Sequence, residues 1–134
     1  MRSPLLDHDR FVRLVRSRDF LAAHSSGRIL IPQAAKIAGI SPWHFTRLYT
    51  RAFGETPHEF MSRRRLEHAQ RLLRGGSLSV TEVCFEVGYE GPGSFSSSFH
   101  RFAGVSPRDY RRLWSFPGAA LLFSVPHCFS AFWI

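Results

Sequence analysis

The sequence predicts an all-α fold that contains the same helical unit twice. Apolar residues recur at the three- and four-residue spacing of amphipathic helices through most of the first 114 residues. Several of these segments begin at Ser-Pro or Thr-Pro and end at Gly, which are typical helix boundaries. A block of sequence also recurs 50 residues further on. No segment shows the alternation of apolar and polar residues expected of a half-buried strand.

About seven helices follow from these signals. They are expected over residues 5–23, 33–38, 42–53, 57–74, 80–87, 92–102 and 107–114. Ser41 is placed to cap the third helix, which opens with a proline. Thr56 with Glu59, and Ser79 with Glu82, match the capping box that opens a helix. Glycines stand after the expected helix ends, at Gly39, Gly54, Gly75, Gly76, Gly88 and Gly104.

The helix over residues 57–74 is the longest, about 27 Å at 1.5 Å per residue. Its apolar stripe is expected to bury Phe60, Met61, Leu66, Ala69, Leu72 and Leu73. In the third helix the core is expected to take Phe45, Leu48, Tyr49 and Phe53. A helix cannot aim Arg63, Arg64 and Arg65 in one direction. At least one of them is expected to bond Glu59, Glu67 or a backbone carbonyl at the edge of the core.

The repeat is the strongest signal in the chain. Its first copy comprises Phe45, Arg51, Gly54, Thr56, Pro57 and Phe60, and its second comprises Phe95, Arg101, Gly104, Ser106, Pro107 and Tyr110. Each copy consists of a short helix, a Gly-containing turn, a second helix and a Gly-x-Ser/Thr-Pro motif. This is the layout of a helix-turn-helix (homeodomain-like) subdomain, in which the second helix enters the major groove of DNA.

The repeat also predicts the domain organisation. We expect a first helix-turn-helix subdomain over residues 5–56, a linker helix over 57–76, a second subdomain over 77–114 and an apolar C-terminal extension over 115–134. A linker helix of this length can hold two reading helices about one turn of duplex apart, ~34 Å. One chain would then read two successive major-groove segments, as a dimer of single units usually does.

These residues resemble the DNA-binding domain of the AraC/XylS family of bacterial transcription regulators. The stretches that carry the resemblance are AAKIAGISPWHFTRLYTRAFGETPHEFMSRRRLEHAQRLL and SVTEVCFEVGYEGPGSFSSSFHRFAGVSPRDYRR. The match covers residues 11–114, and it implies a sequence-specific, DNA-binding transcription regulator of the cytoplasm and nucleoid. Most members also carry an effector-binding domain, so this chain resembles the small stand-alone members or a fragment.

The exposed face of the third helix is the first candidate for reading bases. Trp43, Thr46, Arg47 and Thr50 share that face by their i, i+3, i+4, i+7 spacing. Arg47 suits a bidentate contact with guanine, whereas Trp43 is either a DNA contact or a core aromatic. In the family that the chain resembles, this face contacts bases, and some stand-alone activators place Trp-x-x-x-Arg as here.

The corresponding helix of the second copy is expected to discriminate less between bases. Its base-reading face is expected to hold Gly93, Ser94, Ser96 and Ser97. Many members of the resembling family have an arginine at the position of Ser97, and serine discriminates poorly between bases. The first copy is therefore expected to set most of the sequence preference. The expected phosphate contacts are Ser41, Arg51, His100, Arg101, Arg108, Arg111 and Arg112. About six such contacts predict a slope of about −5 for log K against log salt.

The composition favours an anionic partner and no catalysis. The formal net charge is +8, and 17 of the 18 cationic side chains are arginine, with codon bias as the alternative explanation. No zinc-ligand spacing, phosphate-binding loop or nucleophile motif occurs, so we expect no enzyme, no metal and no cofactor. Cys84 lies among valines and is expected in the core. Two cysteines 44 residues apart indicate no disulfide framework.

The last 20 residues are uncharged at pH 7 apart from His127, and 13 of them are apolar. Proline and glycine interrupt this extension, so a membrane-spanning helix is not expected. We expect it to fold back over the second subdomain; a dimer or partner surface and an exposed, aggregation-prone tail are the alternatives.

The partner expected for the chain is double-stranded promoter or operator DNA, bound by a monomer. RNA polymerase and a dimer through the tail are further candidates, and no membrane is expected. The competing hypothesis is a non-enzymatic protein-interaction module, for polymerase or another regulator, with degenerate DNA readout.

Overall fold

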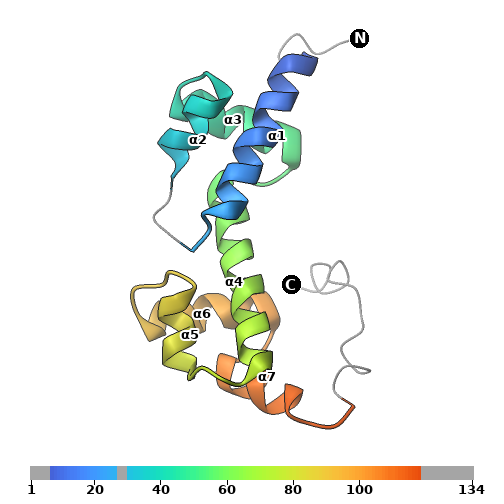
Figure 1. Ribbon diagram of the computed structural model, residues 1–134, viewed down its shortest axis with the longest axis vertical. Helices are drawn as coiled ribbons and strands as arrows, with labels where there is room; N and C mark the ends of the chain where they lie inside the picture. The colour runs from blue at the N-terminus through green and yellow to red at the C-terminus, as the bar shows by residue number, and fades with distance from the viewer. Residues whose placement is uncertain (1–6, 27–29, 119–134) are drawn as a thin grey trace. The chain divides into compact units, whose positions relative to one another are not determined.

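The computed structural model describes residues 7–26 and 30–118, which form seven α-helices and no strand. The helices are α1 (His8–Ala23), α2 (Ile31–Ala38), α3 (Pro42–Phe53), α4 (Pro57–Gly75), α5 (Val80–Glu86), α6 (Pro92–Ala103) and α7 (Pro107–Trp114) (Figure 1). The described residues divide into two compact units, one up to Arg65 and one from Leu66 onward. α4 therefore begins in the first unit and continues in the second. The prediction of an all-α fold with about seven helices is confirmed.

Side-chain caps fix the helix starts that the sequence predicts. The Ser41 hydroxyl accepts from the backbone N–H of His44 at 3.3 Å. Thr56 and Glu59 form the complete capping box: the Thr56 N–H donates to the Glu59 carboxylate at 2.8 Å, and the Glu59 N–H donates to the Thr56 hydroxyl at 3.1 Å. Gly54 ends α3 at a φ of 75°, which glycine adopts without steric strain.

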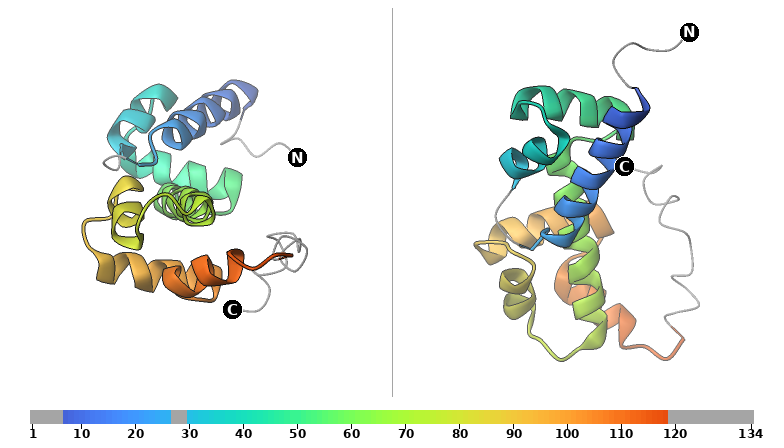
Figure 2. Two further views of the ribbon diagram at one scale, coloured as in Figure 1. Left: turned by 60° about the horizontal axis from the view of Figure 1, so that its bottom comes forward. Right: turned by 45° about the horizontal axis from the view of Figure 1, so that its top comes forward.

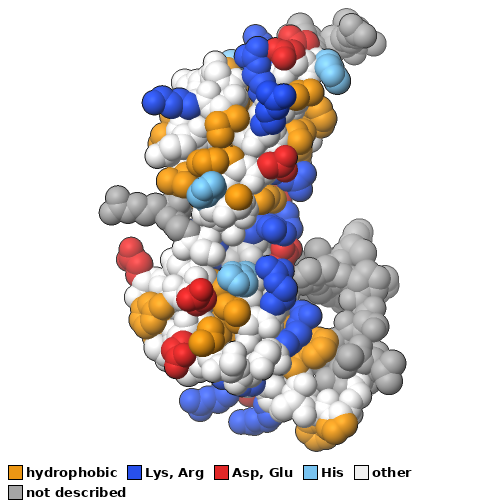
Figure 3. Space-filling model, viewed as in Figure 1, with side chains coloured by type: hydrophobic (Ala, Val, Ile, Leu, Met, Phe, Trp, Pro, Cys, Tyr) orange, Lys and Arg blue, Asp and Glu red, His pale blue; other side chains and the backbone are white. Residues whose placement is uncertain are grey.

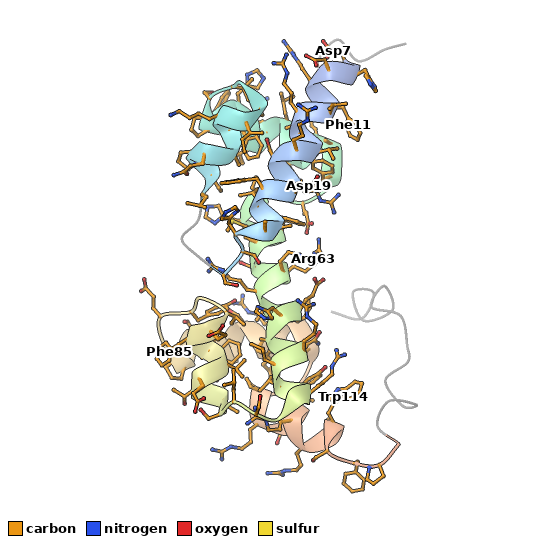
Figure 4. The ribbon with its side chains drawn as sticks, in the orientation of Figure 1. Asp7, Phe11, Asp19, Arg63, Phe85 and Trp114 are labelled. Carbon is orange, nitrogen blue, oxygen red and sulfur yellow. The ribbon has the colours of Figure 1, made fainter. Side chains whose placement is uncertain are left out.

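Two helix starts differ from the sequence expectation. α1 begins at His8, three residues later than predicted, because Asp7 takes the N-cap position and its carboxylate accepts from the Arg10 N–H at 2.8 Å (Figure 4). α2 begins at Ile31, two residues earlier than predicted, with Pro32 in its first turn. A proline is tolerated there because the first N–H groups of a helix have no intrahelical partner.

The first unit encloses one apolar core. Its buried members are Leu14, Leu21, Ile31, Ala34, Ala35, Ala38, Phe45, Leu48, Tyr49, Phe60 and Met61. The predicted burial of Phe45, Leu48 and Tyr49 is confirmed, and Phe53 is half-buried against the same core. Full burial of one such side chain stabilises the fold by about 1.5–3 kcal/mol. The buried Ser17 hydroxyl donates to the Ala34 carbonyl at 2.8 Å and so ties α1 to α2.

The second unit has a core of its own. Its buried members are Leu66, Ala69, Leu73, Val83, Cys84, Val87, Phe95, Phe99 and Tyr110. The views in Figures 1 and 2 agree that α5, α6 and α7 gather around the second half of α4. Cys84 is buried as predicted, and burial raises the pKa of its thiol. Leu72, expected in the buried stripe of α4, is half-buried.

The sequence repeat is a structural repeat as well. Residues 51–60 and 101–110 follow the same order of buried, half-buried and exposed side chains at every position. α3 and α6 both begin at a proline and both end at a glycine with positive φ, 75° for Gly54 and 82° for Gly104. The two helices therefore display equivalent positions on equivalent faces.

The expectation that residues 115–134 fold back over the second subdomain lies largely outside the described residues. Of this segment the structure describes residues 115–118, among which Phe116 is exposed. Within the described parts of the chain, every helix is too short or too polar to cross a membrane.

Candidate nucleic-acid interface

In the first unit, the second helix of the helix-turn-helix presents a polar face. The opposite face of α3 is anchored in the core by Phe45, Leu48 and Tyr49. The turn from α2 passes through Gly39, which ends α2 at a φ of 73°. Because the anchored face fixes the rotation of α3, it also fixes which side chains are left for a partner.

Trp43 and Arg47 form one exposed group on this face. The side chain of Trp43 is 69% exposed, so it is not a core aromatic. The guanidinium carbon of Arg47 lies 4.7 Å from the centre of the Trp43 ring. A cation–π contact of this kind contributes about 0.5–1 kcal/mol at an exposed site. It restricts the Arg47 guanidinium before any partner arrives.

Thr46 and Thr50 lie beside this pair and are half-buried. The Thr46 hydroxyl donates to the Pro42 carbonyl at 3.0 Å, and the Thr50 hydroxyl donates to the Thr46 carbonyl at 2.7 Å. The two threonines, Arg47 and Arg51 line an open hollow of about 420 Å³. The sequence spacing predicted a shared face for Thr46, Arg47 and Thr50, and the structure brings these three residues together around the hollow, with Arg51 beside them.

α6 carries a different surface on the same framework. The residues of its outer face are Gly93, Ser94, Ser97, His100 and Arg101, all exposed, with Ser96 half-buried. Gly93 stands where α3 has Trp43, and Ser97 stands where α3 has Arg47. A Cβ atom added to Gly93 would meet no atom within 4 Å. The absence of large side chains at these two positions is therefore not imposed by packing.

The expected phosphate contacts fall into two groups. Ser41, Arg51, His100, Arg101, Arg108 and Arg112 are exposed. Arg111 is half-buried, and its guanidinium donates to the backbone carbonyls of Leu73, at 3.5 Å, and Leu78. These two bonds tie α7 to the end of α4 and to the segment before α5. On the face drawn in Figure 3, basic side chains occur on both units.

Arg18 of α1 packs against aromatic rings at the end of α3 and the start of α4, a role that the sequence did not indicate. Its guanidinium carbon lies 4.8 Å from the centre of the Phe53 ring and 5.2 Å from that of Phe60. Phe53 ends α3 and Phe60 lies in the first turn of α4, so Arg18 fastens α1 to both. The feature of the sequence that could have indicated this contact is the pair of aromatic residues on either side of the turn between α3 and α4.

Tyr49 lies at the centre of the same packing. Its ring centre is 4.7 Å from that of Phe53 and 6.2 Å from that of Phe60. Burial raises the pKa of the Tyr49 hydroxyl from 10.0 to about 12, although the nearby charges of Arg18 and Arg63 act in the opposite direction. The hydroxyl is therefore held in its neutral form.

Two of the three consecutive arginines of α4, Arg63 and Arg65, bond to different segments of the first unit. Arg63 forms a bidentate pair with Glu55, with the closest contact at 2.7 Å, which is a partner that the sequence did not suggest (Figure 4). Arg65 donates to the backbone carbonyl of Ser25, the kind of acceptor that was predicted. Both bonds hold the segments around α1 and α3 against the start of α4.

Comparison with known proteins agrees with this architecture. Residues 34–113 match the family model described as "Helix-turn-helix domain". The chain belongs to this family, and its resemblance to AraC-type regulators is confirmed. It is 36% identical over 78 residues to the HTH-type transcriptional regulator GlxA of Rhizobium meliloti, a match that covers 58% of this chain and 24% of GlxA. The chain also spans less than half the length of two further curated relatives.

Two solved structures are similar at 28% identity. One is the C-terminal domain of AraT, a response regulator from Geobacillus stearothermophilus, with a TM-score of 0.68 over 82% of this chain and 85% of that one. The other is the DNA-binding domain of AdpA, a global transcriptional factor, in complex with a target DNA. Its TM-score is 0.69 over 75% of this chain and 91% of that one.

Proposed function

We propose that this chain is a sequence-specific DNA-binding domain that regulates transcription and reads two successive major-groove segments of a duplex. The observation that carries the proposal is the exposed Trp43–Arg47 pair on α3, the second helix of a helix-turn-helix. The likeness to the DNA-bound domain of AdpA and the net charge of +8 support it.

Within this function the first unit reads bases, and the second unit mainly contacts the DNA backbone. Arg47 reads guanine through two hydrogen bonds, with Trp43, Thr46 and Thr50 beside it. α6 contributes Gly93, Ser94, Ser96 and Ser97, which read bases weakly, so the second unit mainly holds the phosphate backbone. The phosphate contacts are Ser41, Arg51, His100, Arg101, Arg108 and Arg112. We leave Arg111 out of this set because its guanidinium already donates to two backbone carbonyls.

The remaining assignments complete the proposal. The functional segments are residues 5–56, 57–76, 77–114 and 115–134, and the chain acts in the cytoplasm without catalysis. It binds DNA as a monomer, and dimerisation through residues 115–134 is the alternative. RNA polymerase is the protein partner expected if the chain activates transcription.

The test is selection of preferred duplexes from random DNA, followed by binding measurements on single variants. Arg47→Ala is expected to relax base preference at one position by about 1–3 kcal/mol, whereas Ser97→Ala leaves the preference nearly unchanged. Arg16→Ala, which removes an exposed arginine of α1, is the charge-matched control. A larger loss of specificity in Ser97→Ala than in Arg47→Ala would overturn the division of work.

A salt titration tests the DNA partner itself. The four arginines of the phosphate set give a slope of about −4 for log K against log salt on random duplex. If the chain fails to bind duplex DNA even at low salt, the protein-interaction hypothesis replaces this one.

A further inference from the structure

The hollow beside Arg47 has a chemistry that guanine recognition alone does not use. The hydroxyl groups of its two threonines already donate hydrogen bonds to the backbone carbonyls of Pro42 and Thr46. Thr46 and Thr50 therefore have no proton to donate to a partner in the hollow. They offer it methyl groups and oxygen lone pairs.

A DNA base can match this surface in the major groove. Guanine presents two acceptors there, N7 and O6, which suit Arg47, and thymine presents a methyl group at C5. Cytosine has no group at C5 unless it is methylated, and 5-methylcytosine carries the same methyl as thymine. A donor pair beside two threonine methyls therefore complements a guanine next to a 5-methylpyrimidine.

We propose that the hollow formed by Thr46 and Thr50 binds the 5-methyl group of a pyrimidine adjacent to the guanine that Arg47 contacts. This inference rests on the proposed function, because it places α3 in the major groove. The hollow, about 420 Å³ and open to solvent, has room for the edge of a base. Arg51 also lines the hollow, is exposed, and supplies a cation for the backbone phosphate.

The first arm of the test varies the DNA and keeps the full chain unchanged. In the duplex obtained by selection, each thymine beside a recognised guanine is replaced by uracil, and each cytosine by 5-methylcytosine. Burial of one methyl group corresponds to about a fourfold change in affinity. We expect uracil to weaken binding about fourfold at one position, and 5-methylcytosine to bind about fourfold more tightly than cytosine at that position.

The second arm varies the protein with matched pairs. Thr46→Val and Thr50→Val keep the methyl group and remove the hydroxyl, whereas Thr46→Ser and Thr50→Ser keep the hydroxyl and remove the methyl. The valine variants are expected to retain the preference for thymine over uracil, and the serine variants to lose most of it. Thermal melting of all four variants identifies any that have lost the fold.

Three results are decisive against the inference. Equal affinities for thymine and uracil at every flanking position, in a duplex whose binding depends on Arg47, overturn it and leave the proposed function intact. Retention of the preference for thymine over uracil in the serine variants, which lack the threonine methyl groups, would show that these methyl groups do not contact the 5-methyl group, and it likewise overturns the inference. Absence of any preferred duplex overturns both the inference and the proposed function.

Discussion

Trp43 and Arg47 are best understood as one functional group on α3. Trp43 is 69% exposed, so most of its ring gains no stabilisation from burial in the unbound protein. The Arg47 guanidinium lies over this ring. A free arginine side chain loses rotamer freedom when it binds, a cost of up to about 2 kcal/mol. Stacking on Trp43 reduces that cost by restricting the side chain beforehand. Trp43 is therefore a positioning residue for Arg47.

This role predicts a difference between two substitutions of Trp43. Trp43→Phe keeps an aromatic face and is expected to lower affinity for the selected duplex less than about twofold, whereas Trp43→Leu is expected to lower it about two- to fivefold. Without DNA, the NMR signals of the Arg47 side chain should move downfield in Trp43→Leu as the ring current is lost. Unchanged Arg47 signals in Trp43→Leu would rule out the stacked pair independently of any DNA measurement.

Tyr49 gives the first unit a dependence on alkaline pH. Burial raises the pKa of its hydroxyl from 10.0 to about 12, so the unfolded chain releases this proton at lower pH than the folded chain. Between these values the unfolded state binds fewer protons, and the free energy of unfolding falls as pH rises. The stabilisation is complete below about pH 10 and is lost as pH approaches 12.

The measurement is denaturant unfolding between pH 9 and pH 12, with Tyr49→Phe as the comparison. One such proton contributes a slope of at most about 1.4 kcal/mol per pH unit. Tyr49→Phe should show a shallower decline than the original chain over this range. Tyr110 and Cys84, whose pKa values burial also raises, remain in both proteins and contribute to the residual slope.

At the scale of the element, α3 and α6 are one scaffold with two surfaces. Their buried aromatics, first-turn prolines and terminal glycines correspond, but Gly93 and Ser97 replace the tryptophan and arginine of α3. A Cβ at Gly93 meets no neighbour within 4 Å, so larger side chains fit there. The surface of α6 can therefore be changed without repacking its core.

The double substitution Gly93→Trp with Ser97→Arg should give α6 the reading pair of α3. We expect a new preference for guanine in the segment read by the second unit, about 1–3 kcal/mol in favour of the right base, detected by repeating the selection. Replacement of Gly93 in the helix also favours folding slightly. Thr81→Arg adds the same charge at an exposed position of α5, outside the proposed reading surface, and should raise affinity without adding a base preference. An identical preference in both variants would show that charge alone is responsible.

At the scale of the whole molecule, two separate cores share one continuous helix. The first two turns of α4 supply Phe60 and Met61 to the first core, and its later turns supply Leu66, Ala69 and Leu73 to the second. Each unit is therefore stabilised by the burial of its own apolar side chains. Because α4 belongs to both units, unfolding of one unit affects the other through this helix.

This arrangement predicts unequal effects of a mutation in the second core. Phe99→Ala removes a fully buried ring and should destabilise the second unit by about 3–5 kcal/mol. Amide hydrogen exchange is expected to show lost protection in α5, α6 and α7, with the protection of α1, α2 and α3 largely retained. Equal loss in both units would mean that the two cores unfold as one cooperative body.

The sequence alone determined the helices and their duplication, because those signals are local. Caps such as Ser41 and the Thr56–Glu59 box, terminal glycines and the spacing of apolar residues depend on neighbours within a turn or two of helix. The shared face of Trp43, Thr46, Arg47 and Thr50 followed from the same periodicity. For the same reason the contrast between Arg47 and Ser97 was visible in the repeat.

Only the tertiary structure decided which polar groups are already engaged. Arg18 lies between Phe53 and Phe60, and Arg111 donates to backbone carbonyls of residues more than 30 positions earlier in the chain. Periodicity assigns a side chain to a face but does not say what packs against that face. The fate of each arginine therefore depended on contacts between segments distant in sequence, and only the folded chain supplies those contacts.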